Sequence, residues 1–354
     1  MAKQNSFIDT IDQIITDGVN KGILHLNNED EFLEGNTITL KGKEVVNFGS
    51  CSYLGLEFDR RLKDGAIEAL EKYGTQFSES RAYVSVKLYK DLENYFEQIF
   101  NASVVVSPTT TLGHIAAIPV LVSENDAVII DHQAHNSIQT ACNLLKPKGI
   151  HVELLRHNRM DLLEEKIKEL KNKYDRIWYM ADGIYSMYGD ACPVKDVYAL
   201  MDKYKMLHLY VDDAHGMSCF GTNGSGYVMS QAPLHQRAVL AVSLAKAFAT
   251  GGAVLVFPDK ELARKVRTCG GPLITSGPMQ PAALGAAIAS AKIHLSNEIY
   301  DLQETLQDNI QFARLMIEKY NLPIISPSAA PVFFIGVSLP KLGYNMVHRM
   351  LNEG

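Results

Sequence analysis

The sequence has few cysteines and no recognisable pattern among them. Of its 354 residues five are cysteine, an odd number, and no two have the C-x-x-C spacing of a zinc site or redox motif. They are Cys51, Cys142, Cys192, Cys219 and Cys269. Scattered thiols of this kind are typical of proteins in a reducing compartment. We therefore expect no disulfide framework and no metal site, and we predict a cytoplasmic protein with free thiols.

The sequence also lacks a basic tract and a long apolar run. The formal net charge is −6, so nothing indicates a nucleic-acid partner. A membrane-spanning helix needs about 20 apolar residues, and no run reaches that length. The small, apolar stretch at 282–291 is more typical of a buried helix, and the first seven residues (MAKQNSF) are not the apolar core of a signal peptide. With 47% hydrophobic and 21% charged residues, the chain has the composition of an ordinary globular protein.

From about residue 60, short apolar stretches alternate with stretches of helical periodicity. The predicted strands are 103–107, 127–131, 152–155, 176–181, 207–211, 238–242 and 253–257. The predicted helices are 60–73, 88–100, 112–122, 137–146, 160–173 and 195–205. Strands alternating with helices indicate βαβ units, and therefore an α/β fold with a mostly parallel sheet. In such sheets, ligands bind at the carboxyl ends of the strands.

Both ends of the chain differ from this alternating region. An amphipathic helix is predicted at 8–24, followed by a short strand at 44–48. After about residue 290 the pattern changes to helical segments within 293–320 and a strand at 332–337. We predict three parts: an N-terminal helix and arm (1–45), a large domain (46–290) and an incomplete small C-terminal domain (291–354).

Lys246 lies in a segment of small and apolar residues, 241–252 (AVSLAKAFATGG). Burial among such residues favours the neutral amine, which can form a Schiff base with an aldehyde. Asp212 directly follows a predicted strand, where a carboxylate can pair with a pyridinium nitrogen. A lone lysine in apolar surroundings more often extends its head to water. However, Ser243 and the glycine pair beyond the lysine are typical of a phosphate-side turn, and the combination predicts a pyridoxal phosphate (PLP) enzyme.

Three further polar segments follow predicted strands. Residues 107–114 (SPTTTLGH) start a helix, which is either a plain N-cap or an anion site for a cofactor phosphate. His135 either stacks on a flat cofactor ring or lies in a surface loop. Residues 182–190 (DGIYSMYGD) offer a carboxylate and a hydroxyl, but the same pattern forms simple turns. His215, three residues after Asp212, is placed to bond a phenolate oxygen.

Six motifs resemble those of the α-oxoamine synthases. They are NFGSCSYLGL at 47–56, HNRMDLLE at 157–164, DGIYSMYGDACP at 182–193, VDDAH at 211–215, GTNGSG at 221–226 and SLAKA at 243–247. The family consists of PLP-dependent acyl-CoA:amino-acid acyltransferases, among them serine palmitoyltransferase, 8-amino-7-oxononanoate synthase, 2-amino-3-ketobutyrate CoA ligase, 5-aminolevulinate synthase and autoinducer synthases. The motifs follow in the expected order from about residue 45 to 290. The chain is therefore identified as a member of this family.

The resemblance implies a fold and a reaction. The implied fold is the fold-type I PLP-dependent transferase, similar to aspartate aminotransferase, with a mostly parallel central sheet and a smaller α+β domain. The implied reaction is the decarboxylative condensation of an amino acid of the glycine, alanine or serine type with an acyl-CoA. Its products are an α-oxoamine, CoA and CO2. In the family the enzyme is a homodimer whose subunits share their active sites.

The resemblance also implies a role for individual residues. The implied catalytic residues are Lys246, which would hold the cofactor as a Schiff base and remove the α-proton, Asp212 at the pyridinium nitrogen, His135 on the ring, and His215 near the phenolic oxygen. The implied cofactor-binding residues are Thr109, Thr110, His135, Asp182, Ser186, Asp212, His215, Ser243 and Lys246, together with Thr275 and Ser276 from the neighbouring subunit. The implied substrate-binding residues are Ser52 and His135.

Several positions depart from the family pattern. Cys51 and Ser52 replace two residues that are usually Asn followed by Asn or Asp, and the second of these normally touches the substrate carboxylate. The remaining departures are Thr110 for an aromatic residue, Tyr89 for a histidine and Ser225 for an arginine. We expect the family's carboxylate-binding arginine to lie beyond the last residue of this chain.

Two other functions are compatible with parts of the pattern. A different fold-type I enzyme, of the aminotransferase or aldolase type, would use the same lysine and aspartate but release no CoA. A non-catalytic partner subunit of a related synthase would explain the departures at Cys51, Ser52 and Tyr89, but it would not need Lys246.

Overall fold

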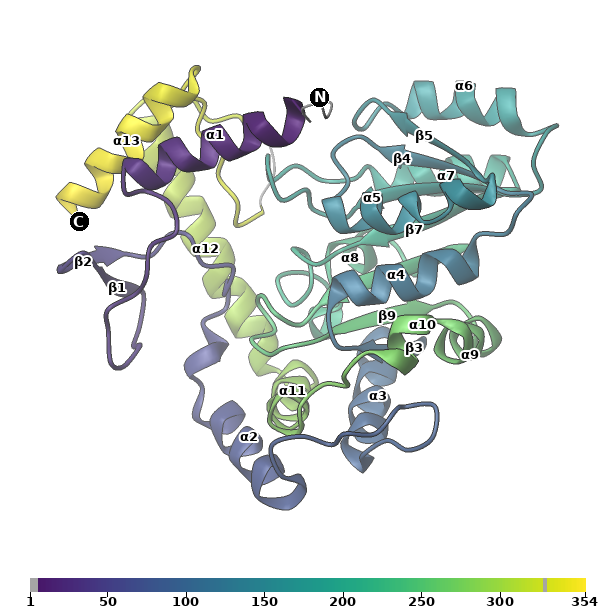
Figure 1. Ribbon diagram of the computed structural model, residues 1–354, viewed down its shortest axis with the longest axis horizontal. Helices are drawn as coiled ribbons and strands as arrows, with labels where there is room; N and C mark the ends of the chain where they lie inside the picture. Colours follow the sequence, from purple (N-terminus) through teal and green to yellow (C-terminus); the bar gives the residue numbers. More distant parts are fainter. Residues whose placement is uncertain (1–5, 327–329) are drawn as a thin grey trace, which may run out of the picture. The chain divides into compact units, whose positions relative to one another are not determined.

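The computed structural model describes residues 6–326 and 330–354 (Figure 1). Contacts within the chain group these residues into two compact units. The larger unit comprises Cys51–Tyr320 with Ser326–Phe334, apart from 327–329, which are not described. The smaller unit comprises the described residues up to Ser50 with Asn321–Ile325 and Ile335–Gly354. The predicted division at residues 45 and 290 stays a prediction.

A seven-stranded sheet forms the centre of the larger unit in the described part of the chain, with the order β3-β9-β8-β7-β6-β4-β5. The strands are β3 (Ser103–Ser107), β4 (Ala127–Asp131), β5 (His151–Leu155), β6 (Ile177–Asp182), β7 (Leu207–Asp212), β8 (Ala238–Ser243) and β9 (Ala253–Phe257). Neighbouring strands from β8 to β5 are parallel, whereas β9 runs antiparallel to both β3 and β8. The predicted mostly parallel sheet is confirmed.

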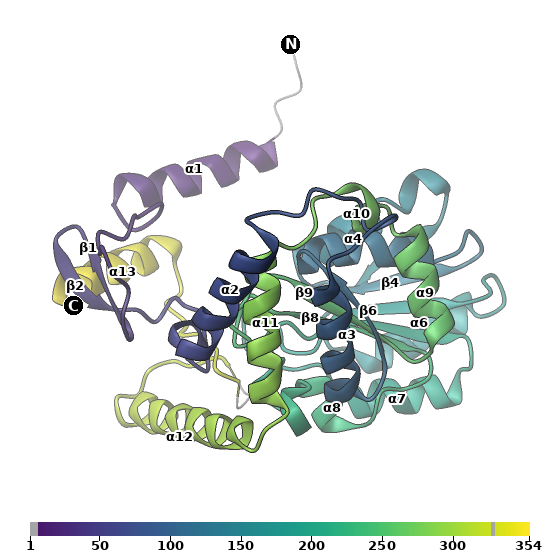
Figure 2. The same ribbon diagram turned by 90° about the horizontal axis from the view of Figure 1, so that it is seen from below.

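Helices cover both faces of this sheet (Figure 2). In the larger unit they are α2 (Arg60–Tyr73), α3 (Lys87–Phe100), α4 (Thr110–Leu121), α5 (Asn136–Asn143), α6 (Met160–Leu170), α7 (Val194–Lys203), α8 (Tyr227–Gln231), α9 (Lys260–Cys269), α10 (Gly271–Thr275), α11 (Pro281–His294) and α12 (Glu298–Lys319). Side chains of α3, α6, α7 and α11 join the core on one face, and those of α4, α5, α9 and α10 join the core on the other. Among the described residues, no helix is long and apolar enough to cross a membrane.

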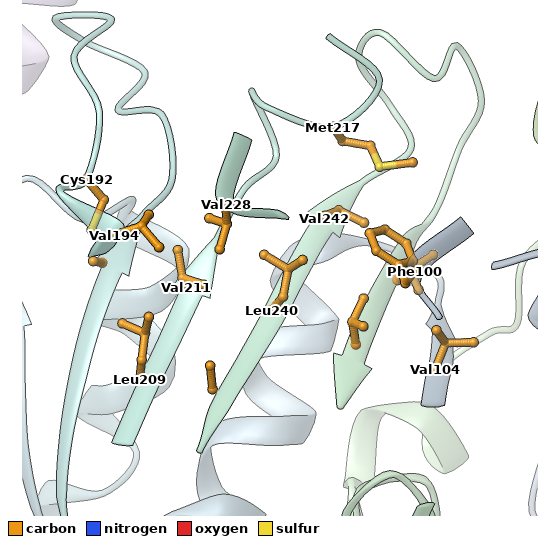
Figure 3. Packing of buried hydrophobic residues seen from close by; sticks show 14 of the residues in the cluster. Phe100, Val104, Cys192, Val194, Leu209, Val211, Met217, Val228, Leu240 and Val242 are labelled. Atoms are coloured by element: carbon orange, nitrogen blue, oxygen red, sulfur yellow. The ribbon is translucent and has the colours of Figure 1, made fainter. Parts of the chain in front are cut away.

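Alternating side chains of each strand divide the core into two layers. In β6, Tyr179 packs into the layer beneath α6 and α7, whereas Trp178 and Met180 pack into the layer beneath α4 and α5. Figure 3 shows the first layer around β7 and β8, where Val211 and Leu240 lie side by side on neighbouring strands. Because both faces are covered, β4, β6, β8 and β9 are buried along their whole length instead of alternating between buried and exposed residues.

Two glycines allow α2 and α11 to touch backbone to backbone. A Cβ atom added to Gly285 would lie 2.1 Å from the carbonyl oxygen of Gly65, and one added to Gly65 would lie 2.7 Å from the carbonyl oxygen of Gly285. Real Cβ atoms do not approach oxygen so closely, so a side chain at either position would force the helices apart. The small, apolar stretch at 282–291 thus forms the buried middle of α11.

The smaller unit joins segments from the two ends of the sequence. Its elements are α1 (Ser6–Asn20), the antiparallel strands β1 (Thr37–Leu40) and β2 (Lys43–Val46), and α13 (Pro340–Glu353). The Lys21 ammonium donates to the Asn345 side chain at 3.1 Å, and the Tyr344 hydroxyl donates to the Ile14 carbonyl at 3.2 Å. The strand predicted at 332–337 is wrong, because this segment makes only one isolated bridge, from Ile335 to Ile324.

Candidate active site

A cavity of about 350 Å³ lies in the larger unit, at the carboxyl ends of β3, β4, β6, β7 and β8. This is where a parallel sheet places its ligand sites. Eight of the predicted site residues line it: Thr109, Thr110, His135, Asp182, Asp212, His215, Ser243 and Lys246. A larger groove, between α2, α3 and α11, is lined by none of the predicted site residues.

One end of the cavity is suited to an anion. Thr109 is the N-cap of α4, and its hydroxyl accepts the Leu112 N–H group at 3.1 Å. The first N–H groups of a helix have no partner within the helix, and together with the helix dipole they attract negative charge. Thr110, Thr111 and the hydroxyl-bearing Ser243 line the cavity beside this helix start. The two interpretations of residues 107–114 are therefore compatible, since one threonine caps the helix and the helix start remains open to the cavity.

A buried carboxylate and an amine face the same cavity. Burial alone would raise the pKa of Asp212, but contact with His114 and the charge of Lys246 lower it to about 2. The carboxylate is therefore ionised at neutral pH. Burial lowers the pKa of Lys246, an effect that the carboxylates of Asp212 and Asp182 oppose. The structure thus combines an ionised aspartate with a lysine that releases its proton more readily than an exposed one.

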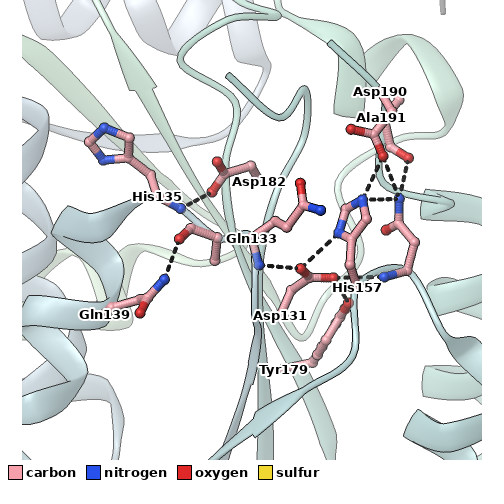
Figure 4. Close-up of polar contacts among 11 residues, drawn as sticks. Asp131, Gln133, His135, Gln139, His157, Tyr179, Asp182, Asp190 and Ala191 are labelled. Atoms are coloured by element: carbon pink, nitrogen blue, oxygen red, sulfur yellow. Dashed lines mark hydrogen bonds and ion pairs between the residues drawn. The ribbon is translucent and has the colours of Figure 1, made fainter. Parts of the chain in front are cut away.

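His135 and Asp182 form the wall that continues from β4 and β6 (Figure 4). The backbone N–H of His135 donates to the Asp182 carboxylate at 3.0 Å, which fixes the start of α5. The His135 ring bonds the Ser137 hydroxyl at 2.6 Å, and burial lowers the pKa of the ring. Burial and the nearby Asp212 raise the pKa of Asp182. The His135 ring is thus a neutral, flat surface at the cavity wall.

His215 lies on the β7 side of the cavity and contacts a residue that the sequence did not single out. The Tyr53 hydroxyl is 2.7 Å from Nδ1 of His215. Burial lowers the pKa of His215 to about 3, so its ring is neutral at physiological pH. Tyr53 belongs to the motif at 47–56, which is therefore brought to the site through this contact.

Four predicted residues lie outside the lining of the cavity: Ser52, Ser186, Thr275 and Ser276. The hydroxyls of Thr275 and Ser276 donate back to carbonyl groups of their own short helix, α10. The segment around them is held from α3, where the Tyr89 hydroxyl accepts the Met279 N–H group at 2.6 Å. The departure at Tyr89 therefore has a structural role in fixing this segment.

The sequence did not identify His114 and Ser137. His114 is fully buried in α4 and bonds Asp212, and Ser137 lines the cavity beside His135. The available signal for His114 was its place one turn beyond Thr109, on a helix that starts at the anion end. That signal is weak, because a lone histidine in an apolar helix is usually a core residue.

A second histidine ties the segment 182–190 to the sheet. His157 lies between two carboxylates, 2.9 Å from Asp131 and 2.5 Å from Asp190 (Figure 4). Burial would lower the pKa of His157, but its bonds to Asp131 and Asp190 raise it to about 9. The imidazolium therefore joins the end of β4 to the far end of the segment that carries Ser186.

The contacts of the charged His157 ring with Asp131 and Asp190 predict a contribution to the free energy of unfolding that depends on pH. The pKa of histidine in the unfolded chain is about 6.5, so protonation of His157 stabilises the fold fully below that pH, and the contribution is lost as pH rises toward 9. Urea unfolding should therefore show a stability difference between the wild type and His157→Gln that is largest near pH 6 and shrinks toward pH 9. As a control, His208→Gln should show the opposite trend, because burial lowers the pKa of His208 and protonation of this residue near pH 6 therefore favours the unfolded chain. A stability difference that stays constant between these pH values would contradict a stabilising role of the charged His157 ring.

The family model for aminotransferase class I and II matches residues 43–352. An 8-amino-7-oxononanoate synthase from Treponema denticola is 33% identical over 264 residues, which are 74% of this chain and 65% of that enzyme. Another from Alkaliphilus metalliredigens is 30% identical over 89% of this chain and 78% of that enzyme. The chain belongs to the aminotransferase class I and II family, and within it to the α-oxoamine synthases.

A solved structure gives the same result for the fold. A serine palmitoyltransferase from S. paucimobilis superposes with a TM-score of 0.90 over 99% of this chain and 90% of that chain, at 21% sequence identity. The predicted family and the predicted fold-type I architecture are confirmed. The motifs at 182–193, 211–215 and 243–247, which carried the family prediction, are also those that supply Asp182, Asp212 and Lys246 to the cavity.

Proposed function

We propose that this protein is a PLP-dependent acyltransferase that condenses a glycine-, alanine- or serine-type amino acid with an acyl-CoA. A carbon–carbon bond forms between the α-carbon and the acyl carbon, the thioester C–S bond breaks, CoA leaves as the thiol, and the carboxyl group leaves as CO2. The observation that carries the proposal is the joint placement of Lys246, Asp212 and the α4 helix start around one cavity. The names of the relatives are consistent with it: 8-amino-7-oxononanoate has an amine beside a ketone, and serine palmitoyltransferase transfers an acyl group to an amino acid.

The cavity fits PLP at each of its chemical groups. The N–H groups of Thr109 and Thr110 and the Ser243 hydroxyl would hold the phosphate, which suits the anion end. Asp212 would pair with the ring nitrogen, and the neutral His135 ring would lie on the cofactor face. His215 would contact the phenolic oxygen, whereas the contact implied for Ser186 stays a prediction, because Ser186 does not line the cavity. When bound, the cofactor supplies an electron sink that stabilises negative charge on the α-carbon of the amino acid.

The residues of this chain would do the rest of the chemistry. The Lys246 amine, whose pKa burial lowers, would hold the cofactor and, once free, accept the α-proton at Nζ. Asp212 remains ionised and keeps a negative charge opposite the ring nitrogen. His135 would contact the substrate, whereas the contact implied for Ser52 stays a prediction, because Ser52 does not line the cavity. Cys51 and Ser52 differ from the residues of most family members at these positions.

The reaction can be tested directly on PLP-loaded protein. Glycine, alanine and serine are titrated in turn while the visible absorbance is followed, and acyl-CoAs of several chain lengths are then added. We expect equal amounts of CoA thiol and CO2 to appear. Formation of an oxo acid or of an aldehyde without thiol would instead support the aminotransferase or aldolase alternative. A protein that binds PLP but responds to none of these compounds would support the non-catalytic partner subunit.

We also propose a homodimer with shared active sites in the cytoplasm. Thr275 and Ser276 lie outside the cavity of their own chain, yet their segment is held firmly through Tyr89 and through the Ser80 hydroxyl, which donates to the Ile274 carbonyl at 2.7 Å. A rigid segment with hydroxyl groups suits a role at the phosphate of a second copy. The five cysteines are all free, which supports a reducing compartment.

Mixing two inactive variants should restore activity if the sites are shared. Lys246→Ala and a Thr275→Ala/Ser276→Ala double variant should each be weak alone. In a mixed dimer, one of the two sites would have both an intact lysine and an intact phosphate segment. Random exchange of subunits should therefore recover up to about a quarter of wild-type activity. The measurement is CoA release after mixing, with exchange followed independently by two affinity tags. Exchange without recovery would place both halves of the site in one chain.

A further inference from the structure

A buried histidine and tyrosine lie against Asp212, outside the lining of the cavity. Tyr210 and Asp212 are two residues apart on β7, so their side chains share one face of the sheet. His114 of α4 lies between them, with Nδ1 2.8 Å from the Tyr210 hydroxyl and Nε2 2.9 Å from Oδ2 of Asp212. His114 and Tyr210 are 0% exposed, and Asp212 is 5% exposed. The three groups thus form a chain of hydrogen bonds in the core.

The partners of His114 fix its ring and the proton on Nε2. An ionised carboxylate only accepts, so Nε2 of His114 must donate to Asp212. The other ring nitrogen, Nδ1, lies within hydrogen-bond distance of the Tyr210 hydroxyl, so the buried hydroxyl also has a partner. The ring of His114 is thus held between Tyr210 and Asp212, with Nε2–H directed at the carboxylate.

Each oxygen of Asp212 has one fixed donor from the protein. Oδ1 accepts the backbone N–H of Ala214 at 3.0 Å, and Oδ2 accepts His114 at 2.9 Å. The remaining acceptor capacity of this carboxylate is available to the cavity, which Asp212 lines. The other titratable groups close enough to affect it are Lys246, Asp182, Asp213, His135, His215 and Tyr210.

We infer that His114 is a positioning residue, whose Nε2–H group keeps the Asp212 carboxylate ionised and oriented toward the ring nitrogen of the cofactor. The inference rests on the proposed function, because Asp212 needs this orientation only if it pairs with that nitrogen. A hydrogen bond to an ionised group in the core is stronger than one between neutral groups. Tyr210 acts one step further away, by fixing the ring that donates.

The test separates this role from simple packing. His114→Leu combined with Tyr210→Phe removes both polar partners at similar volume, so no buried hydroxyl is left unpaired. Tyr210→Phe alone keeps the bond between His114 and Asp212, and His114→Gln restores a donor through its amide. The readouts are the unfolding temperature of the cofactor-free protein, the PLP affinity from absorbance titration, and the pH dependence of that affinity.

We expect the double variant to fold and to bind PLP about tenfold more weakly. The loss of affinity on the acidic side should move to higher pH, because a carboxylate without its donor takes up a proton more readily. Tyr210→Phe should show a smaller effect, and His114→Gln should recover part of the affinity. In an Asp212→Asn background the same changes at 114 and 210 should add little, because the group they act through is no longer a carboxylate.

Two results would overturn the inference. One is a double variant with wild-type PLP affinity and an unchanged pH dependence. The other is an equal loss of affinity with and without Asp212→Asn. Should the double variant fail to fold, His114→Gln and the shorter His114→Asn give the same comparison, and equal affinities for the two would count against the role. A wild-type protein that binds no PLP would instead overturn the proposed function, and this inference with it.

Discussion

Lys246→Ala should abolish the covalent attachment of PLP and reduce the rate of CoA release by about a thousandfold or more. The reason is that one amine is proposed to have two tasks, holding the cofactor and accepting the α-proton. Burial lowers the pKa of this lysine and makes the neutral amine more available at physiological pH. Borohydride treatment of wild-type protein should fix a pyridoxyl group on the peptide that contains Lys246, which mass spectrometry can locate.

Lys260→Ala is a suitable control for this experiment. Lys260 is the exposed first residue of α9 and does not line the cavity. This variant should remain yellow with PLP and keep its rate. A pyridoxyl group found on any lysine other than Lys246, or a Lys246→Ala variant that still traps the cofactor, would remove the basis of the assignment.

Most of the site could be predicted because ligands of a parallel sheet bind at the carboxyl ends of its strands. The strand prediction placed Asp212 and Lys246 just beyond two apolar runs, and in a parallel sheet such positions meet at one edge. The observed register makes Asp182 and Asp212 direct partners on β6 and β7. The sequence thus predicted that these residues lie close together, because strands separated by helices can be connected within one sheet in only a few ways.

Other features depend on contacts that a single sequence does not reveal. The antiparallel direction of β9 is not visible in its apolar run, which would suit either direction. The apolar stretch at 332–337 has the composition of a strand but pairs only at Ile335, so pairing and not propensity decided its structure. His114 looked like a core residue of an apolar helix, and its role emerges only because Tyr210 and Asp212 share the face of β7 that α4 covers.

Asp212→Asn should leave the protein folded but slow CoA release by roughly a hundredfold or more, or about 3 kcal/mol of transition-state stabilisation. The amide keeps the shape of the side chain but removes the negative charge that would keep the ring nitrogen of the cofactor protonated. PLP should still bind in part, because the phosphate end and Lys246 are unchanged. The measurements are the rate of CoA release and the PLP affinity of the variant.

The neighbouring Asp213 provides the matched control. Asp213 is fully buried on the same strand exit, and burial raises its pKa to about 8, so it is mostly neutral at pH 7. Its carboxyl group accepts the Val228 N–H group at 2.9 Å and does not line the cavity. Asp213→Asn should therefore lower stability without a comparable loss of rate, since it removes little charge. If Asp212→Asn turned over almost normally while Asp213→Asn did not, the ring nitrogen would have the other carboxylate as its partner, and the assignment of the two aspartates would be reversed.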